Sequence, residues 1–269
     1  MVKNDLSVGK EMSSLPLIIA HRGASAHAPE NTLAAFQVAL NAGADGVEFD
    51  VQLALNGVPV VIHDETLERT GLKVGSVSDL TAKQLGRIDV GSWFNKKYRK
   101  RAKPEFAGET IPTLAQVLSL LKDFRGLIYI ELKPHEADYR ELSKAVCDAI
   151  RDSPLLPQII VKSFKLAAIP EVRHHLPEVQ TAALLEPTIM DFLRRRKQIL
   201  AIAREFGADQ ISIHYSLVTR KLVALAASAG MPVTIWTTDD TKWVKRSEKR
   251  GIRALITNDP AKLLAVRDR

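Results

Sequence analysis

The chain is poor in cysteine and aromatic residues, and it contains no long apolar run. Its single cysteine, Cys147, excludes an internal disulfide and a cysteine-based zinc site. Cys147 lies in a helix-like stretch, where we expect a small buried residue and not a nucleophile. No apolar run approaches the roughly 18–20 residues that span a bilayer, so we expect no membrane insertion.

The N-terminal region lacks the pattern of a secretory signal. Residues 1–14 are polar and mixed in charge, and we expect them to form a tail. The apolar run that follows, residues 15–20, contains a proline and is shorter than the roughly 7–15 residues that a signal requires. We therefore expect a cytoplasmic protein whose residues 15–269 form a single domain.

Positive charge is in modest excess. Among 269 residues, 38 are lysine or arginine and 31 are acidic, which gives a formal net charge of +7. This excess admits nucleic acid, a membrane surface or a phosphorylated substrate as partner. Two basic clusters, residues 96–103 and 194–197, are either solvated faces or binding surfaces. No recognition motif accompanies them, so we expect a small-molecule substrate and no nucleic acid; the oligomeric state is left open.

Short apolar runs alternate with segments of helical spacing. Such spacing is clearest where Leu114, Val117, Leu118 and Leu121 follow one another at i, i+3, i+4 and i+7. The apolar runs occupy residues 17–20, 46–53, 127–132, 159–162, 179–184, 210–213, 233–237 and 254–257. They are mostly continuous, as in strands covered on both faces. Eight such units predict an α/β fold, a (β/α)₈ TIM barrel; an open doubly wound sheet is the alternative.

Two segments do not fit a bare barrel. Residues 58–62 follow the turn dipeptide Asn56-Gly57, which predicts a hairpin arm on the second strand. Residues 71–110 have no clear strand–helix period. We expect them to form a small insertion in the connection after the second strand, at the functional end of the barrel.

Carboxylates gather where two strands end. Glu48 and Asp50 are two residues apart on one strand, so their side chains point the same way. Facing the helices would bury unpaired charges at several kcal/mol each, so we expect them in the barrel mouth with Glu131. The three would repel one another unless a cation joined them, and oxygen ligands suit Mg²⁺, Ca²⁺ or Mn²⁺. A structural set of ion pairs with Arg22 and Lys133 is the alternative.

Histidines and fixed cations lie near the same strand ends. His21 and His63 could act as general base and general acid, although either alone is more often structural. Arg22 and Lys133 supply positive charge that suits a phosphoryl group. Trp236 belongs to the core or stacks on a substrate at the mouth. Together these groups predict a site that cuts or transfers a phosphate ester.

Motifs follow one another in order along the chain. They are HRG at 21–23, APENT at 28–32, GADGVEFDV at 43–51, VVIHD at 60–64, RT at 69–70, IPTL at 111–114, ELK at 131–133, SF at 163–164, WT at 236–237 and ITNDP at 256–260. This set resembles the signature of the glycerophosphodiester phosphodiesterases of the cytoplasmic bacterial type, over about residues 17–265.

The resemblance implies a (β/α)₈ barrel that hydrolyses glycerophosphodiesters to sn-glycerol 3-phosphate and an alcohol. It further implies histidine acid–base catalysis through a cyclic phosphate. The implied roles are as follows: Glu48, Asp50 and Glu131 hold one divalent cation, His21 and His63 form the acid–base pair, Arg22 and Lys133 bind phosphate, Glu30 and Asn31 shape the site around the first histidine, and Trp236 packs against glycerol.

The chain departs from the family pattern in two places. Ala54 and Asn56-Gly57 stand where threonine and Asp-Gly are common, and Asn258 stands where aspartate is common. Neither change affects a metal or acid–base position. His214 ends the sixth strand, where it either reaches the cleft or is structural. A related barrel phospholipase D-like enzyme that acts on lysophospholipids and a binding module without catalysis are the alternative functions.

Overall fold

The computed structural model describes residues 15–135, 138–191, 193 and 197–269. The predicted tail, residues 1–14, and residues 194–196 of the second basic cluster lie outside the described residues.

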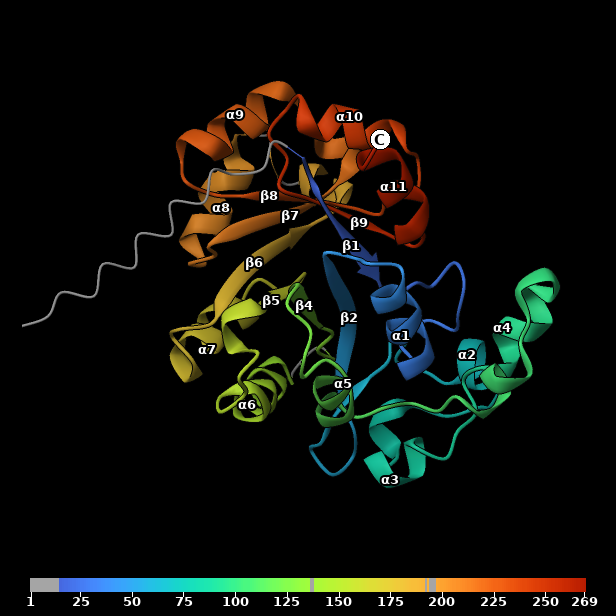
Figure 1. The fold of residues 1–269 in the computed structure, drawn as a ribbon. Helices are drawn as coiled ribbons and strands as arrows, with labels where there is room; N and C mark the ends of the chain where they lie inside the picture. Colours follow the sequence, from blue (N-terminus) through green and yellow to red (C-terminus); the bar gives the residue numbers. More distant parts are fainter. Residues whose placement is uncertain (1–14, 136–137, 192, 194–196) are drawn as a thin grey trace, which may run out of the picture.

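Eight parallel strands close into a barrel (Figure 1). In chain order they are β1 (Leu17–His21), β2 (Gly46–Leu53), β4 (Leu127–Leu132), β5 (Ile159–Ser163), β6 (Gln180–Leu185), β7 (Gln210–His214), β8 (Val233–Trp236) and β9 (Ala254–Thr257). Strand β1 pairs with both β2 and β9, which closes the sheet. This closure confirms the predicted TIM barrel and rules out the open sheet.

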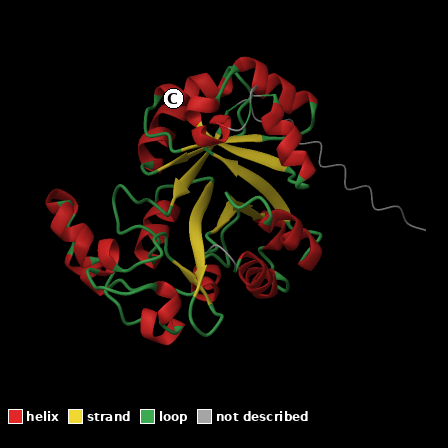
Figure 2. Ribbon diagram, turned by 180° about the vertical axis from the view of Figure 1, so that it is seen from behind, coloured by secondary structure: helices red, strands yellow, loops and turns green. Residues whose placement is uncertain are grey.

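Helices form a ring around the strands, as the view from behind shows (Figure 2). The ring contains α1 (Leu33–Asn41), α5 (Leu114–Leu120), α6 (Tyr139–Ile150), α7 (Ala168–His175), α8 (Gln198–Glu205), α9 (Arg220–Ser228), α10 (Lys242–Glu248) and α11 (Pro260–Arg267). Their apolar faces and the outer faces of the strands form two large buried clusters. Cys147 of α6 is fully buried, and burial raises the pKa of its thiol to about 12.

The barrel interior is closed below the mouth by its own side chains. Ile19, Tyr129, Ile160 and Ile256 form a buried cluster on the inner faces of four strands. The Tyr129 hydroxyl lies 3.1 Å from Thr234 Oγ1, so a buried polar atom of this layer is partnered. The interior below the mouth is thus packed with side chains and is not a pore.

The connection between β2 and β4 is longer than the others. Strand β3 (Pro59–Val61) pairs antiparallel with β2, which confirms the predicted hairpin arm. After it come three short helices: α2 (Glu68–Gly71), α3 (Ala82–Leu85) and α4 (Ser92–Lys97). Helix α4 is fastened by a cluster of rings that contains Trp93, Phe94 and Phe106. Figure 1 shows these helices beside the barrel, near α1 and α5.

Within the described part of the chain, no helix is long and apolar enough to cross a bilayer.

Candidate active site

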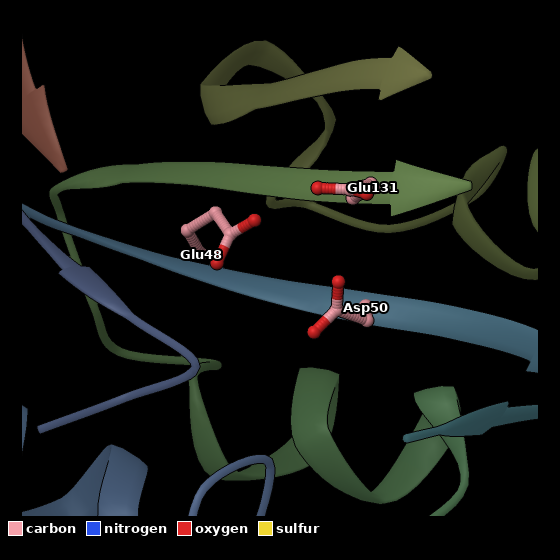
Figure 3. Close-up of side chains that lie close together, drawn as sticks. All are labelled: Glu48, Asp50 and Glu131. Atoms are coloured by element: carbon pink, nitrogen blue, oxygen red, sulfur yellow. The ribbon is translucent and has the colours of Figure 1, made fainter. Parts of the chain in front are cut away.

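Three carboxylates converge at the mouth of the barrel. Glu48 and Asp50 project from β2, and the register of β2 against β4 places Glu131 directly opposite Asp50 (Figure 3). Their side chains are buried, and one carboxylate oxygen from each lies within 4.8 Å of the others. The other residues of the two strands are mostly apolar, so the fold itself brings three like charges into one small buried volume.

A buried lysine that the sequence analysis did not single out neutralises part of this charge. Lys162 of β5 is only 2% exposed, and its Nζ lies 2.7 Å from Glu48 Oε1 and 3.5 Å from Glu131 Oε2. Burial disfavours the ammonium, but the two carboxylates outweigh burial and raise the pKa of Lys162. Burial likewise disfavours the Glu48 carboxylate, yet Lys162 and His21 lower its pKa overall.

Arg22 fastens the loop after β1 to the carboxylates. Its backbone adopts the left-handed conformation, with φ of 55°, and its amide donates to Glu48 Oε2 at 3.2 Å. Its guanidinium lies 2.7 Å from Glu30 Oε1 and 3.1 Å from Asp50 Oδ2. Asn31, also left-handed at φ of 58°, donates from Nδ2 to Asp50 at 2.9 Å. Asparagine tolerates this conformation, but arginine does not favour it, so at Arg22 the placement of the side chain outweighs local strain.

Charge around Asp50 is closely balanced. Burial opposes ionisation of Asp50, but Arg22 and Lys133 outweigh it, so the pKa of this carboxyl lies well below its usual range. Lys133 Nζ lies 2.8 Å from Glu131 Oε1 and 3.6 Å from Asp50 Oδ1. Burial lowers the pKa of Lys133, but the carboxylates of Glu131 and Asp50 raise it more, so the pKa increases overall. The ion pairs with Arg22 and Lys133, which the sequence offered as the alternative to a cation, are therefore present.

His21 is oriented by a side-chain amide. Its Nδ1 lies 2.7 Å from Asn258 Oδ1, and the Asn258 Nδ2 donates to Asp239 Oδ2 at 2.8 Å. Because Asp239 takes the amide hydrogens, Asn258 presents its oxygen to His21, and the network assigns the ring proton to Nδ1. Nε2 is then directed at the carboxylates, 3.9 Å from Glu48 Oε2.

His63 is oriented by a carboxylate. Its Nδ1 lies 2.6 Å from Asp64 Oδ1, which leaves Nε2 for the site. Arg69 donates from Nε to Asp64 Oδ2 at 2.5 Å, and its two terminal nitrogens donate to Glu30 at 2.8 Å each. Gln52 secures the backbone below, because its buried Nε2 donates to the carbonyls of His63 and Asp64 at 2.9 Å each. Arg69 thus links Asp64, the partner of His63, to Glu30, the partner of Arg22.

An aromatic wall borders the mouth opposite the loop after β1. The rings of Phe164 and Trp236 meet edge to face at 5.4 Å, and His214 lies 5.3 Å from Trp236. Lys133 Nζ lies 5.7 Å from the Phe164 ring. His214 therefore faces the aromatic side of the mouth, where burial lowers its pKa. This wall offers apolar surface beside the charged groups.

The carboxylates fit a hard divalent cation. All donors are oxygens, which is the ligand set that Mg²⁺, Ca²⁺ and Mn²⁺ prefer. Asp50 Oδ1 is buried and has no hydrogen-bond partner within the described ranges, with Lys133 Nζ at 3.6 Å. A buried carboxylate oxygen without a donor is costly, and a metal ion would satisfy it. Glu48, Asp50 and Glu131 are therefore suited to hold one ion.

The chain also matches known proteins. The model of the glycerophosphoryl diester phosphodiesterase family matches residues 21–262. A glycerophosphodiester phosphodiesterase from Caldanaerobacter subterraneus is 34% identical over 248 residues, which are 92% of this chain and 96% of that protein. The chain belongs to the glycerophosphoryl diester phosphodiesterase family. The resemblance drawn from the motifs is confirmed, and with it the expected class of enzyme.

Solved structures of this family share the fold. An Oleispira antarctica phosphodiesterase in complex with the product sn-glycerol-3-phosphate has a TM-score of 0.83 at 28% identity, and the match covers 95% of this chain and 98% of that one. A glycerophosphodiester phosphodiesterase from Agrobacterium tumefaciens has a TM-score of 0.76 at 26% identity, with 93% and 100% covered.

The residues to which the resemblance assigns roles lie at or beside the mouth of this phosphodiesterase fold. Glu30 contacts Arg22 and Arg69, whereas Asn31 contacts Asp50 and not His21. The motifs do not include Lys162, Gln52 or Asp239, and they contain Asp64 and Arg69 without a role for either. Inward alternation could have indicated Gln52, because it is two residues from Asp50, which is predicted to point inward. No such prediction exists on the strand of Lys162.

Proposed function

We propose that the protein is a metal-dependent hydrolase that converts glycerophosphodiesters to sn-glycerol 3-phosphate and an alcohol. The observation that carries this proposal is the convergence of three buried carboxylates with two oriented histidines at one barrel mouth. Family membership and the product bound to the Oleispira phosphodiesterase support the substrate class. We take residues 15–269 as one catalytic domain, with residues 71–110 as its insertion.

Glu48, Asp50 and Glu131 would hold one divalent cation. When bound, the ion would neutralise the carboxylates and polarise a phosphoryl oxygen. Arg22 and Lys133 flank the same carboxylates and would bind the remaining phosphoryl oxygens as fixed cations. A phosphodiester carries one negative charge, so it can replace part of the ion pairing that these two cations make with acidic side chains.

His21 and His63 would divide the proton transfers. Both present Nε2 to the site, because Asn258 and Asp64 occupy their Nδ1 atoms. One histidine takes the proton of the substrate's glycerol 2-hydroxyl while that oxygen forms a bond to phosphorus. The bond from phosphorus to the alcohol oxygen breaks, and the other histidine gives its proton to that oxygen. Tethering of the nucleophile removes much of the entropic barrier.

Water then opens the cyclic phosphate, and the two histidines exchange roles. The histidine that received the glycerol proton returns it to the 2-oxygen, while its partner takes a proton from water. The net products are glycerol 3-phosphate and the free alcohol. Trp236 and Phe164 would face the carbon skeleton of glycerol, since they form the apolar wall of the mouth.

Substrate analogues and variants test this scheme. Hydrolysis of glycerophosphocholine should yield glycerol 3-phosphate and choline. The reaction is followed by phosphorus NMR. The analogue that carries propane-1,3-diol in place of glycerol has no 2-hydroxyl and should not turn over. Turnover of that analogue would contradict the cyclic route, and full activity in both His21→Ala and His63→Ala would contradict the acid–base assignment.

A further inference from the structure

The insertion carries a dense group of cations. Six lysines and arginines occupy residues 96–103, and this stretch contains no acid, so it accounts for all but one unit of the net charge of +7. All six side chains are exposed. Among the residues that the structure describes, no carboxylate lies within 4.0 Å of their charged groups. The cations repel one another and so destabilise the folded chain, and an anionic partner would relieve this repulsion.

The cationic segment is held in a defined shape. The Tyr98 ring packs on Phe94 at a centroid distance of 4.9 Å, and the Asn95 side chain bonds the backbone of Lys103 at 2.8 and 3.0 Å. Arg101 donates to the Ala26 carbonyl in the loop after β1 at 2.5 Å. Residues 96–101 line an open hollow of about 390 Å³. These contacts hold the charged segment against the rest of the fold.

Exposed apolar side chains lie on the same insertion. Leu72 and Val74 are 50% and 84% exposed, and Lys73 stands between them. They follow α2 directly, and α2 packs against α4, which begins the cationic segment. Leu72 adopts φ of 52°, a conformation that leucine disfavours. Exposure of an apolar side chain to water in this way is unfavourable.

We propose that this docking face, residues 96–103 with Leu72 and Val74, binds the surface of an anionic phospholipid bilayer. Clustered cations are attracted to acidic headgroups, and exposed apolar side chains enter the boundary between headgroups and acyl chains. Two signals of this kind give reversible peripheral binding without a spanning helix. A nucleic acid would use the cations but would leave Leu72 and Val74 in water.

The choice of a lipid surface rests on the proposed function. A glycerophosphodiester is a phospholipid from which both acyl chains have been removed, so a membrane is where such a substrate arises. The docking face also adjoins the site. The Trp93 ring of α4 lies 5.6 Å from the guanidinium of Arg69, which holds Asp64 and Glu30. Docking would therefore bring the barrel mouth close to the bilayer.

Sedimentation with vesicles tests the proposal on the full chain. The vesicles are phosphatidylcholine with or without phosphatidylglycerol, and binding should require phosphatidylglycerol and weaken with salt. The triple variant Lys96→Gln/Arg99→Gln/Lys100→Gln should bind about 100-fold more weakly, at about fivefold per cation. The matched control is Lys242→Gln/Lys245→Gln/Lys249→Gln, which removes the same charge at α10, on another side of the barrel (Figure 1). It should bind nearly as the wild type does.

A second pair of variants tests the apolar part. Leu72→Asn/Val74→Thr should weaken binding several-fold, and Asn tolerates the left-handed conformation at position 72, so folding is preserved. Leu225→Asn on α9 is the control for an exposed leucine elsewhere. Equal losses in both charge triples would overturn the proposal. So would unchanged binding of Leu72→Asn/Val74→Thr together with equal affinity for RNA, because the face would then be a general polyanion site.

The assay separates this proposal from the proposed function. Turnover of soluble glycerophosphocholine is measured on the same preparations, and the charge triple should retain it. Binding that depends on residues 96–103 in a protein without turnover would support the docking face and contradict the hydrolase. Turnover without vesicle binding would support the hydrolase and contradict the docking face.

Discussion

Replacement of Lys162 tests how the barrel tolerates its three buried carboxylates. Lys162→Met keeps the volume of the side chain but removes the charge, which leaves Glu48 buried beside Glu131 and Asp50. At 2.7 Å and an effective dielectric constant near 20, attraction between Lys162 and Glu48 is about 6 kcal/mol before desolvation is subtracted. Removal of one partner of a buried pair typically costs about 3–5 kcal/mol of the free energy of unfolding.

The assay is thermal unfolding by circular dichroism in chelator, with and without added divalent metal. A loss of about 3–5 kcal/mol corresponds to a fall of roughly 6–20 °C in the midpoint for a chain of this size. Added Mg²⁺, Ca²⁺ or Mn²⁺ should recover more stability in Lys162→Met than in the wild type, because the ion replaces the missing positive charge.

An exposed lysine provides the matched control. Lys144 Nζ lies 2.6 Å from Asp148, nearly the distance of the Lys162 pair, but the side chains are 61% and 49% exposed. Lys144→Met should leave the midpoint unchanged, because water screens the pair. Equal midpoints for the two variants, or a more stable Lys162→Met, would refute the view that Lys162 neutralises the carboxylates.

Three further predictions concern other parts of the molecule. Ellman's reagent should label Cys147 only after unfolding, since a thiol of pKa about 12 holds roughly 2,000-fold less thiolate at pH 8 than an exposed one; rapid labelling of the folded protein would contradict this. Arg69→Met should lower kcat by about 100-fold with a smaller change in KM, and Arg69→Lys should recover only part, because lysine lacks the fork that bonds Glu30 twice; steady-state kinetics in which all three proteins agree would exclude a positioning role. Burial raises the pKa of Glu30, but Arg69 and Arg22 lower it more, so the pKa decreases overall. The ionised Glu30 therefore stabilises the folded protein fully at pH values above its pKa in the unfolded chain, about 4.3, and this stabilisation is lost as the pH falls through its pKa in the folded protein. Urea unfolding should therefore show a steeper loss of stability from about pH 5 to pH 3 in the wild type than in Glu30→Gln, and parallel curves would contradict the shift.

The barrel could be predicted from the sequence because its strands are buried on both faces. Burial on both sides leaves continuous apolar runs, and each predicted strand lies within a residue or so of an observed one at both ends. The insertion lacks such a period, since its helices are short, and α3 and α4 pack into two small clusters apart from the main core. Only its existence, and not its helices, followed from the sequence.

Much of the candidate site was also predictable, because strand ends of a parallel barrel meet at one mouth. Residues such as Glu48, Asp50 and Glu131 stand out as charges in apolar runs. Lys162 and Gln52 also lie on strands, but a single polar residue there has no local signature of its partner. The pairing of Lys162 with Glu131 arises from the register of β5 against β4, which no short stretch of sequence encodes.

The most direct test of the central claim is release of glycerol 3-phosphate from glycerophosphocholine by the wild-type protein, before and after treatment with a chelator. We expect activity to disappear in the chelator and to return when Mg²⁺, Ca²⁺ or Mn²⁺ is restored. Asp50→Asn, which weakens the carboxylate site, should need more metal for the same rate. Full activity in the chelator would contradict the metal-dependent phosphodiesterase proposed for this site.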